Sequence, residues 1–404
     1  MAVGCSKGRR LLSLALCFFL LLSSCLPAAP RFPGAVRPTV KIGLVAPFEG
    51  RYRYVGYDVI YAVRMALQEA NAAGGVAGYG VELVAFDDGA EPAMAIEQAR
   101  KLAADPELVA AIGHFREQTT AAALDAYAEA GIPLVAPAVY TRAITSGAAF
   151  HDRRGAEIYR LGPPAEVLAD ALLHQLGALG HSQAALVTTG GPLGTALQQG
   201  VGRLPTAARV WPVVSPDAPD WLEAVRDSGV EVVLCDATPV KAGETVSALR
   251  GAGWQGDFVG GPELAAPDFA AVAGGAAGGV VFVTPWPFSE TVSFPENLVS
   301  GEETDFAAAY RAVSNGVPPG PLASVAYEAT WVLLEALERD VQAHGAPTRG
   351  GIGAALGATR RDGMLGRVTF DANYSWGDAP LYWYRFDADG VPRISSMNQP
   401  AMRW

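Results

Sequence analysis

The chain has 404 residues, with 30 Lys and Arg against 41 Asp and Glu and a formal net charge of −11. This acidic balance argues against a nucleic-acid partner and against electrostatic attachment to anionic lipid, but it does not exclude a small charged ligand. The length is too great for one small domain, so we expect two lobes.

The first 24 residues have the features of an export signal. Lys7, Arg9 and Arg10 precede an apolar stretch over 11–22 that is short for a bilayer span. The signal ends in LLSSC, which resembles a bacterial lipobox, and that resemblance makes Cys25 the lipid-carrying first residue. The alternative is an ordinary signal peptide with an incidental cysteine. Loss of the three basic residues leaves 27 of the 30 Lys and Arg and a net charge of −14.

Residues 25–38 read CLPAAPRFPGAVRP and are predicted to be a semi-extended tether. Its reach is at most roughly 45 Å at ~3.3 Å per residue. An acyl group on Cys25 would leave Cys235 without a disulfide partner in the mature chain. Cys235 ends the apolar run VEVVLC, so we interpret it as a buried strand residue rather than a nucleophile.

From Thr39 onwards, apolar runs of four to seven residues alternate with helical patterns. One helix has apolar residues spaced by three or four from Ile60 to Ala70 and ends at AAGG. Glu91 and Pro92 open a second helix, and an alanine-rich third helix follows. The predicted strands of this first series are 40–46, 81–86, 108–113 and 132–137.

A second alternating series follows an irregular region at 138–165. Two such series predict two doubly wound lobes, each with a parallel sheet covered by helices. Apolar residues from Leu322 to Ala336 then predict a helix that returns to the first lobe, and 366–390 resembles antiparallel strand with DADG as a turn. The predicted strands of the second series are 184–189, 208–214, 230–236, 256–261 and 278–286.

Four stretches contain motifs that follow one another in a recognisable order along the chain. They are KIGLVAPFEG, ALQEANAAGGVAGYGVELVAFDDGAEPAMAIEQARKLAADPELVAAIGH, AEAGIPLVAPA and LRGAGWQGDFVGGPEL. They resemble the Leu/Ile/Val-binding branch of the type 1 periplasmic binding proteins over essentially all of 39–390. The resemblance implies an α/β protein with two doubly wound parallel-sheet lobes, joined by three hinge crossovers, which close on a small ligand. It places the crossovers near 159–164, 284–287 and 376–380.

These crossovers set the expected domain boundaries. The first lobe would comprise 39–160 with 287–377, and the second lobe 161–286 with 378–404. Residues 1–24 and 25–38 would be the lipoprotein signal peptide and the tether.

The family resemblance also implies a ligand site. Amino-acid-binding members hold the α-carboxylate with hydroxyls and backbone N–H groups of the turns after the third and fourth strands. In the third-strand turn here, FREQTT, the expected serines are replaced by Glu117 and Gln118, whereas Thr119 and Thr120 fit the pattern. The start of a helix at this turn still favours an anion.

The other implied ligand positions are partly kept. Ala138 begins the fourth-strand turn, and Tyr140 stands where threonine is expected. In the second lobe the GPE motif is intact, so Glu263 matches the carboxylate that binds the α-ammonium. Leu193 and Thr238 stand where tyrosines are frequent. The position implied to bind the α-ammonium is therefore kept, whereas the positions implied to bind the α-carboxylate are partly replaced.

Several of these residues have two interpretations. Glu117 either caps the first turn of a helix or faces the ligand, where it would repel a carboxylate. Arg116 either pairs with Glu117, binds a ligand carboxylate in a two-pronged contact, or lies on the surface. Tyr52 and Tyr54, in the loop after the first strand, either contact the ligand or are exposed. Tyr140 is predicted to face the cleft. These features favour a ligand with an amine or amide end over leucine.

Enzymatic interpretations are weak. The glycine-rich TTGGPLG at 188–194 lacks both the lysine of a Walker loop and dinucleotide spacing. The histidines show no metal-binding spacing, and His114, Asp87 and Asp88 belong to family motifs, so no cofactor or metal is expected.

The expected function is that of a solute-binding lipoprotein for an amino-acid-like or amide ligand. It would be a monomer, lipid-anchored outside the cytoplasm, and would deliver its ligand to an ABC permease. The alternative is a sensing module that reports to a membrane partner without transport.

Overall fold

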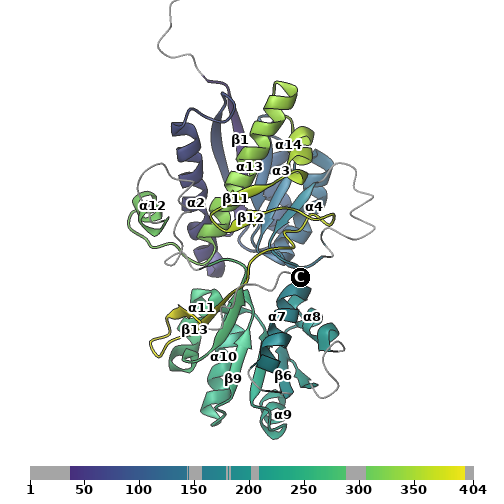
Figure 1. Ribbon diagram of the computed structural model, residues 1–404, viewed down its shortest axis with the longest axis vertical. Coiled ribbons are helices and arrows are strands. Elements are labelled where there is room, and N and C mark those ends of the chain that lie inside the picture. Colours follow the sequence, from purple (N-terminus) through teal and green to yellow (C-terminus); the bar gives the residue numbers. More distant parts are fainter. Residues whose placement is uncertain are drawn as a thin grey trace, which may run out of the picture. The chain divides into compact units, whose positions relative to one another are not determined.

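The computed structural model describes residues 37–142, 144, 157–178, 181, 183–201, 209–287 and 306–395 (Figure 1). The predicted signal peptide and Cys25 lie outside these residues. Residues Thr39–Trp404 form one compact unit. Within the described ranges, each helix is too short or too polar to cross a membrane.

The first sheet is entirely parallel, with the strand order β2-β1-β3-β4-β5. Strands β3 and β4 are apolar along their whole length because helices cover both faces of the sheet, and every residue of these two strands is buried. Its strands are β1 (Thr39–Ala46), β2 (Gly80–Asp87), β3 (Leu108–Gly113), β4 (Leu134–Pro137) and β5 (Ile158–Leu161).

The helices of the first lobe include one that arrives late in the chain. The long helix α13 packs against α2, as Figure 1 shows, and this contact confirms the predicted return to the first lobe. The helices around this sheet are η1 (Gly50–Tyr52), α2 (Arg53–Ala72), α3 (Pro92–Ala103), α4 (Glu117–Ala130), α12 (Phe306–Val313), α13 (Ala323–His344) and α14 (Arg349–Gly357).

The second sheet has the order β14-β13-β10-β9-β8-β6-β7, with β13 and β14 antiparallel to their neighbours and the other pairs parallel. The strands are β6 (Gln183–Thr188), β7 (Arg209–Val214), β8 (Val232–Asp236), β9 (Asp257–Gly260), β10 (Val281–Thr284), β13 (Tyr382–Phe386) and β14 (Pro392–Ile394).

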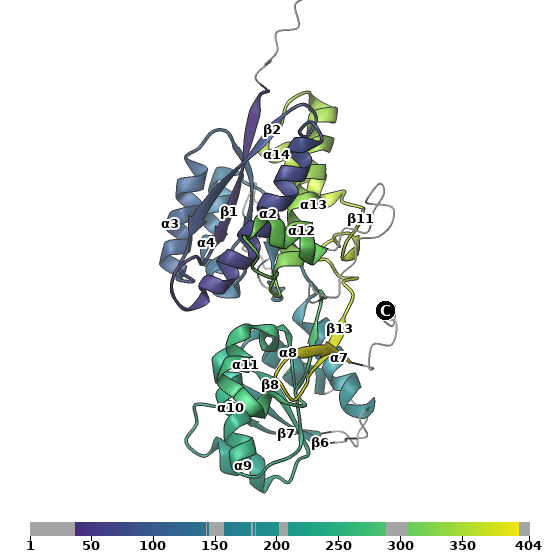
Figure 2. The same cartoon turned by 90° about the vertical axis from the view of Figure 1, so that its left-hand side faces the viewer.

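Helices flank this second sheet as well (Figure 2). The predicted burial of Cys235 in β8 is confirmed, and burial raises the pKa of its thiol. The helices are α7 (Ala165–Ala178), α8 (Pro192–Gly200), α9 (Trp221–Asp227), α10 (Pro239–Gly251), η3 (Pro262–Ala265), α11 (Pro267–Ala273) and η4 (Gly274–Ala277).

The chain passes between the two sheets three times. It leaves the first sheet after β5, returns after β10, and leaves again between β12 (Gly366–Val368) and β13. The predicted fold class, two doubly wound lobes joined by three crossovers, is confirmed. The exact domain boundaries stay a prediction.

Two predicted strands begin two residues later than expected, for a local reason. Ile132 follows Gly131, which ends α4 in the left-handed conformation, and the Ile132 N–H donates to the Tyr127 carbonyl. Val230 similarly closes the turn after α9 through the Ser228 hydroxyl. In both places the first apolar residues of the run complete the preceding turn before the strand starts.

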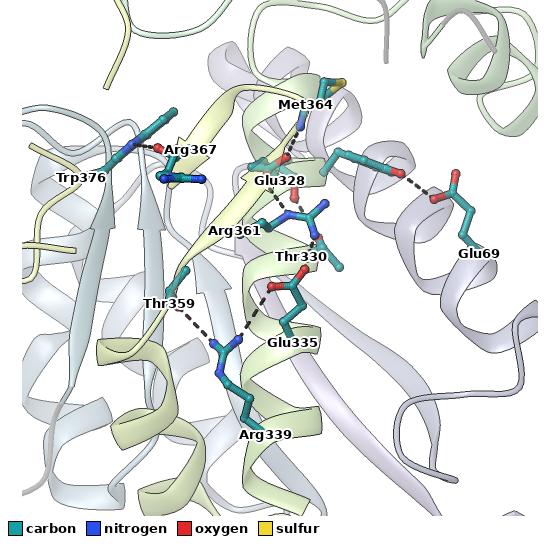
Figure 3. A network of polar contacts seen from close by, with 12 residues as sticks. Glu69, Glu328, Thr330, Glu335, Arg339, Thr359, Arg361, Met364, Arg367 and Trp376 are labelled. Atoms are coloured by element: carbon teal, nitrogen blue, oxygen red, sulfur yellow. Dashed lines mark hydrogen bonds and ion pairs between the residues drawn. The ribbon is translucent and has the colours of Figure 1, made fainter. Parts of the chain in front are cut away.

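A buried polar network fixes the hairpin formed by β11 (Arg361–Gly363) and β12 to α13 (Figure 3). Arg361 Nε donates to Glu328 Oε1 at 2.6 Å, and the backbone N–H of Met364 donates to Glu328 Oε2 at 3.1 Å. Arg361 also pairs with Glu335. Both oxygens of the buried Glu328 carboxylate are therefore bonded.

Candidate functional site

The turn between β3 and α4 positions Arg116 and Glu117. Phe115 has a φ of 66°, a left-handed conformation that reverses the chain, and Arg116 then precedes the first residue of α4 with extended backbone. The guanidinium of Arg116 lies 3.7 Å from the ring centroid of Tyr52, within the range of a cation–π interaction. Arg116 is half-buried, so it is not the freely solvated surface arginine that was one alternative.

The Glu117 side chain reaches across to the turn after β4. Its Oε1 atom accepts hydrogen bonds from the backbone N–H groups of Tyr140, at 2.5 Å, and Thr141, at 2.9 Å. Ala138, with a φ of 57°, makes this turn. The carboxylate thus bonds to backbone donors of another element, whereas the alternative was that it caps its own helix.

The second carboxylate oxygen of Glu117 is in a different situation. Oε2 is buried and has no hydrogen-bond partner among the described residues. Burial raises the pKa of Glu117; the two N–H donors and the positive charge of Arg160 lower it, and Glu263 raises it further. The net result is a pKa above the ordinary value of a glutamate.

Arg160, in β5, supports the turn after β4. It is fully buried; its Nη1 donates to the Tyr140 carbonyl at 3.2 Å, and its Nη2 contacts the Ser375 hydroxyl. Burial lowers the pKa of Arg160 to about 10. The sequence prediction missed this residue because it sits within a strand-like run, IYRL, where its only signal is a charge among apolar residues.

Tyr140 is half-buried and stacks on Trp286, with ring centroids 6.3 Å apart and an interplanar angle of 23°. Burial raises the pKa of the Tyr140 phenol well above its ordinary value, and the charges of Glu263 and Glu117 add to the shift. Tyr140 therefore lies within electrostatic reach of carboxylates from both lobes. Trp286, which follows β10, was not predicted as a site residue.

Glu263 lies in η3, directly after β9. Its side chain is exposed in surface area, yet the surrounding protein removes enough hydration to raise its pKa. Arg116 lowers that pKa by its positive charge, and Asp236 raises it. The Glu263 carboxyl group is therefore accessible to solvent and at the same time crowded by protein atoms.

Asp236 is a second acid that the sequence prediction missed. It ends β8, accepts a hydrogen bond from the Thr188 hydroxyl at 2.8 Å, and is approached by backbone N–H groups of Gly191 and Gly194. Burial raises its pKa, and these hydrogen bonds oppose the shift. The available signal was its place at the carboxyl end of a buried parallel strand, where ligands bind in open α/β sheets.

Tyr52 and Tyr54 lie at the start of α2, with ring centroids 6.5 Å apart. Both are half-buried. Burial raises the pKa of Tyr54, and Glu263 and then Asp268 raise it further by their negative charge. The structure thus brings Tyr52, Tyr54, Arg116 and Glu263 into one electrostatically connected group.

The remaining predicted site residues have other surroundings. Thr119 is fully buried and its hydroxyl donates to the Arg116 carbonyl at 3.3 Å, so it supports the turn. Gln118 and Thr238 are exposed. Leu193 is buried, and a Cβ at Gly261 would lie 2.4 Å from its Cδ2 atom, so this leucine packs tightly beneath the chain that leads to Glu263.

The family-motif residues His114, Asp87 and Asp88 make structural contacts. His114 is fully buried, with Nδ1 at 2.8 Å from Asp88 and Nε2 at 3.1 Å from the Tyr127 hydroxyl. Asp87 accepts hydrogen bonds from the backbone N–H groups of Phe48 and Gly89. In the part of the chain that the structure describes, there is no group of three or more His, Cys, Asp or Glu that could hold a metal.

A surface hollow of about 510 Å³ lies along residues 93–104, on α3 and the residue after it. None of the predicted site residues lines it. We therefore place the candidate site at the ends of the strands, where the charged and aromatic groups converge, and not in this hollow.

Comparisons with known proteins identify the family. The family model described as "Periplasmic binding protein" matches residues 39–391. The leucine-, isoleucine-, valine-, threonine- and alanine-binding protein of Pseudomonas aeruginosa is 25% identical over 345 residues, which cover 82% of this chain and 86% of that protein. The Leu/Ile/Val-binding protein homolog 2 of Brucella abortus is 25% identical over 273 residues, which cover 65% of this chain and 71% of that protein.

Solved structures show the same fold. The leucine-binding protein LivK of Thermotoga maritima has a TM-score of 0.74 at 22% identity, covering 89% of this chain and 98% of that chain. LivJ of Streptococcus pneumoniae in complex with isoleucine has a TM-score of 0.73 at 21% identity, covering 88% and 99%. The chain therefore belongs to the type 1 periplasmic binding proteins, in the Leu/Ile/Val-binding branch, and is a solute-binding protein rather than an enzyme.

Proposed function

We propose that the protein is an extracytoplasmic solute-binding lipoprotein that closes around a small amino-acid-like or amide ligand and delivers it to an ABC importer. The observation that carries the ligand part is the position of Glu263. Its carboxylate interacts electrostatically with Arg116 and Tyr54, which come from the other lobe. A ligand favours the closed form when it contacts residues of both lobes at once. A ligand bound to Glu263 would meet this condition.

In this proposal Glu263 binds the amino or amide end of the ligand, and the half-buried rings of Tyr52, Tyr54 and Tyr140 contact the remainder. Loss of hydration makes the ionised Glu263 carboxylate less stable, as its raised pKa shows. A positively charged partner is therefore favoured there, because an ammonium group would stabilise the ionised carboxylate. Solute receptors of this kind that are related to the chain include proteins named for leucine, isoleucine and valine.

Thermal unfolding with a ligand panel tests the proposal. The panel holds branched, aromatic, basic and acidic amino acids, short amides, urea, amines and simple carboxylates. A ligand at 100-fold its dissociation constant stabilises the native state by about 2.7 kcal/mol. We expect a raised midpoint for at least one amine- or amide-bearing compound, and we expect Glu263→Ala to abolish it.

The matched control is Glu244→Ala, because Glu244 is an acid of the same lobe whose partner is the surface Lys241. The control should keep the ligand-induced shift. A shift that survives in Glu263→Ala would remove Glu263 from the site, and a panel without any shift would contradict the ligand class.

The anchor is tested separately on Cys25. Membrane fractions of cells that express the whole chain should contain the protein, and Cys25→Ser should release it to the soluble extracytoplasmic fraction. An unchanged membrane fraction in Cys25→Ser would contradict the lipoprotein form. Stimulation of the ATPase activity of a reconstituted importer by the ligand-loaded protein would test delivery.

A further inference from the structure

The two turns of the first lobe contain an anion-binding arrangement that the chain itself fills. Two successive backbone N–H groups, those of Tyr140 and Thr141, point to one position at the carboxyl end of β4. Convergent N–H groups of this kind favour a negatively charged oxygen. In the structure that oxygen is Oε1 of Glu117, at 2.5 and 2.9 Å from the two nitrogens.

A ligand carboxylate could use these N–H groups only by displacing Glu117. The glutamate is held at the first position of α4, so it competes intramolecularly, at a high effective concentration. Its Oε2 is already buried without a hydrogen-bond partner in the described part of the chain. A second carboxylate beside it would add like-charge repulsion at a site with reduced hydration.

The charges that face this region are mostly negative. Glu263 acts on Glu117, and Asp236 and Asp268 act on Glu263 and Tyr54 respectively. Of the positively charged residues, Arg160 already contacts the Tyr140 carbonyl and the Ser375 hydroxyl. Arg116 stacks on Tyr52 and offsets the charge of Glu263.

We propose that this site takes an organic amine, a ligand with a protonated amino group and no carboxylate next to it. The ammonium would bind to Glu263, while Glu117 keeps the β4 turn closed to carboxylates. This inference rests on the proposed function, because it assumes that Glu263 is the recognition group of a solute receptor. It specifies the ligand class further, since it excludes ordinary α-amino acids.

Aromatic residues around the acids suit such a ligand. Arg116 already occupies one face of Tyr52, and Tyr140 with Trp286 offers a stacked aromatic surface for an apolar remainder. A hydrocarbon or aromatic group attached to the amine is therefore compatible with the residues present.

The test compares amino acids with their decarboxylated counterparts by isothermal titration calorimetry. The pairs are leucine with 3-methylbutylamine, phenylalanine with phenethylamine, and tyrosine with tyramine, and 3-methylbutanamide is the neutral analogue. For the pair that binds best, we expect the wild-type protein to prefer the amine by at least about tenfold, which corresponds to about 1.4 kcal/mol.

Glu117→Ser should reduce this preference by tenfold or more, because it frees the Tyr140 and Thr141 N–H groups for a ligand carboxylate. Glu117→Gln should have an intermediate effect, because an amide oxygen can still accept from these groups without repelling an anion. The matched control is Glu129→Gln, an exposed acid near the other end of α4 that should leave the preference unchanged. Circular dichroism would confirm that each variant is folded.

The possible failures are distinct. Wild-type binding of an amino acid as tightly as its amine, with dependence on Glu263, would overturn this inference and leave the proposed function standing. Binding of 3-methylbutanamide without 3-methylbutylamine would overturn the requirement for a cation. An unchanged preference in Glu117→Ser would show that Glu117 does not exclude carboxylates. Binding of neither member of any pair would overturn this inference; the proposed function would fail with it only if no compound of the thermal-unfolding panel bound either.

Discussion

Two carboxylates of the first lobe, Glu328 and Glu117, show how similar groups serve different purposes. Both accept a backbone N–H, and both have pKa values raised by burial. Glu328 uses its two oxygens fully, on Arg361 and Met364 (Figure 3). Glu117 uses one oxygen twice and leaves the other buried and unbonded within the described residues.

The difference separates a structural carboxylate from a candidate functional one. A buried charge with a directly bonded partner and satisfied oxygens holds elements together, here α13 and the β11–β12 hairpin. A buried oxygen without a partner costs free energy, and such groups in native structures call for an explanation. At the β3 and β4 turns, exclusion of ligand carboxylates provides that explanation.

The largest expected effect is on the structural side of the comparison. Glu328→Ala leaves the Arg361 guanidinium buried without its main partner, so we expect a loss of about 3–5 kcal/mol in the free energy of unfolding, measured by urea denaturation. Asp362→Ala is the matched control, because it breaks an exposed ion pair with Arg367 on the same hairpin. Its urea midpoint should be the same as that of the wild-type protein within error. Equal effects of the two substitutions would contradict the structural role of Glu328.

A double substitution sharpens this result. Glu328→Leu combined with Arg361→Met removes both buried charges, so the double variant should be more stable than Glu328→Leu alone by at least about 1 kcal/mol. Part of the loss should remain, because Glu335 also loses its contact with Arg361. A double variant less stable than the single variant would show that the pair itself is not the source of the effect.

Substitution of Glu117 should cost less. Glu117→Ala leaves two backbone N–H groups without their acceptor but also removes the unbonded Oε2 atom, so we expect a loss of about 1–2 kcal/mol in the same measurement. Glu117→Gln should retain most of that stability. A loss as large as that of Glu328→Ala would mean that Glu117 is a structural residue of the same kind.

The smallest effect concerns pH. The pKa of Glu117 is raised in the native state from 4.5, so the native state holds this proton more strongly than the unfolded state. Its contribution to stability is fully present below about pH 4.5 and is lost as the pH rises through the native pKa. Relative to Glu117→Gln, the wild-type protein should therefore lose stability as the pH rises above about 4.5, measured by urea denaturation at each pH. A difference that is constant with pH would contradict the raised pKa.

Much of the fold follows from local sequence signals. The alternation of short apolar runs with three-and-four spacing predicts the parallel strands and the helices between them, and DADG predicts the turn at 387–390, where the Gly390 N–H donates to the Asp387 carbonyl. The family resemblance adds the structural roles of His114 and Asp88. These features depend on neighbours in the sequence or on a motif that is recognised directly.

The arrangement of the site depends on contacts that no local pattern contains. The partner of Glu117 lies 23 residues away and is a backbone N–H, so residue types at that turn give no indication of it. The bond forms because Ala138 adopts a left-handed conformation that directs the following N–H groups towards α4. Arg160 and Asp236 were missed for a related reason, since each lies in an apolar strand and acquires its role from the neighbouring strands.

Crystal structures of the protein grown separately with excess leucine and with 3-methylbutylamine test the central claim most directly. We expect Glu117 Oε1 to remain within hydrogen-bonding distance of the Tyr140 and Thr141 nitrogens in both crystals, with the amine nitrogen beside Glu263. A leucine carboxylate on those two N–H groups, with the Glu117 side chain turned away, would contradict the account.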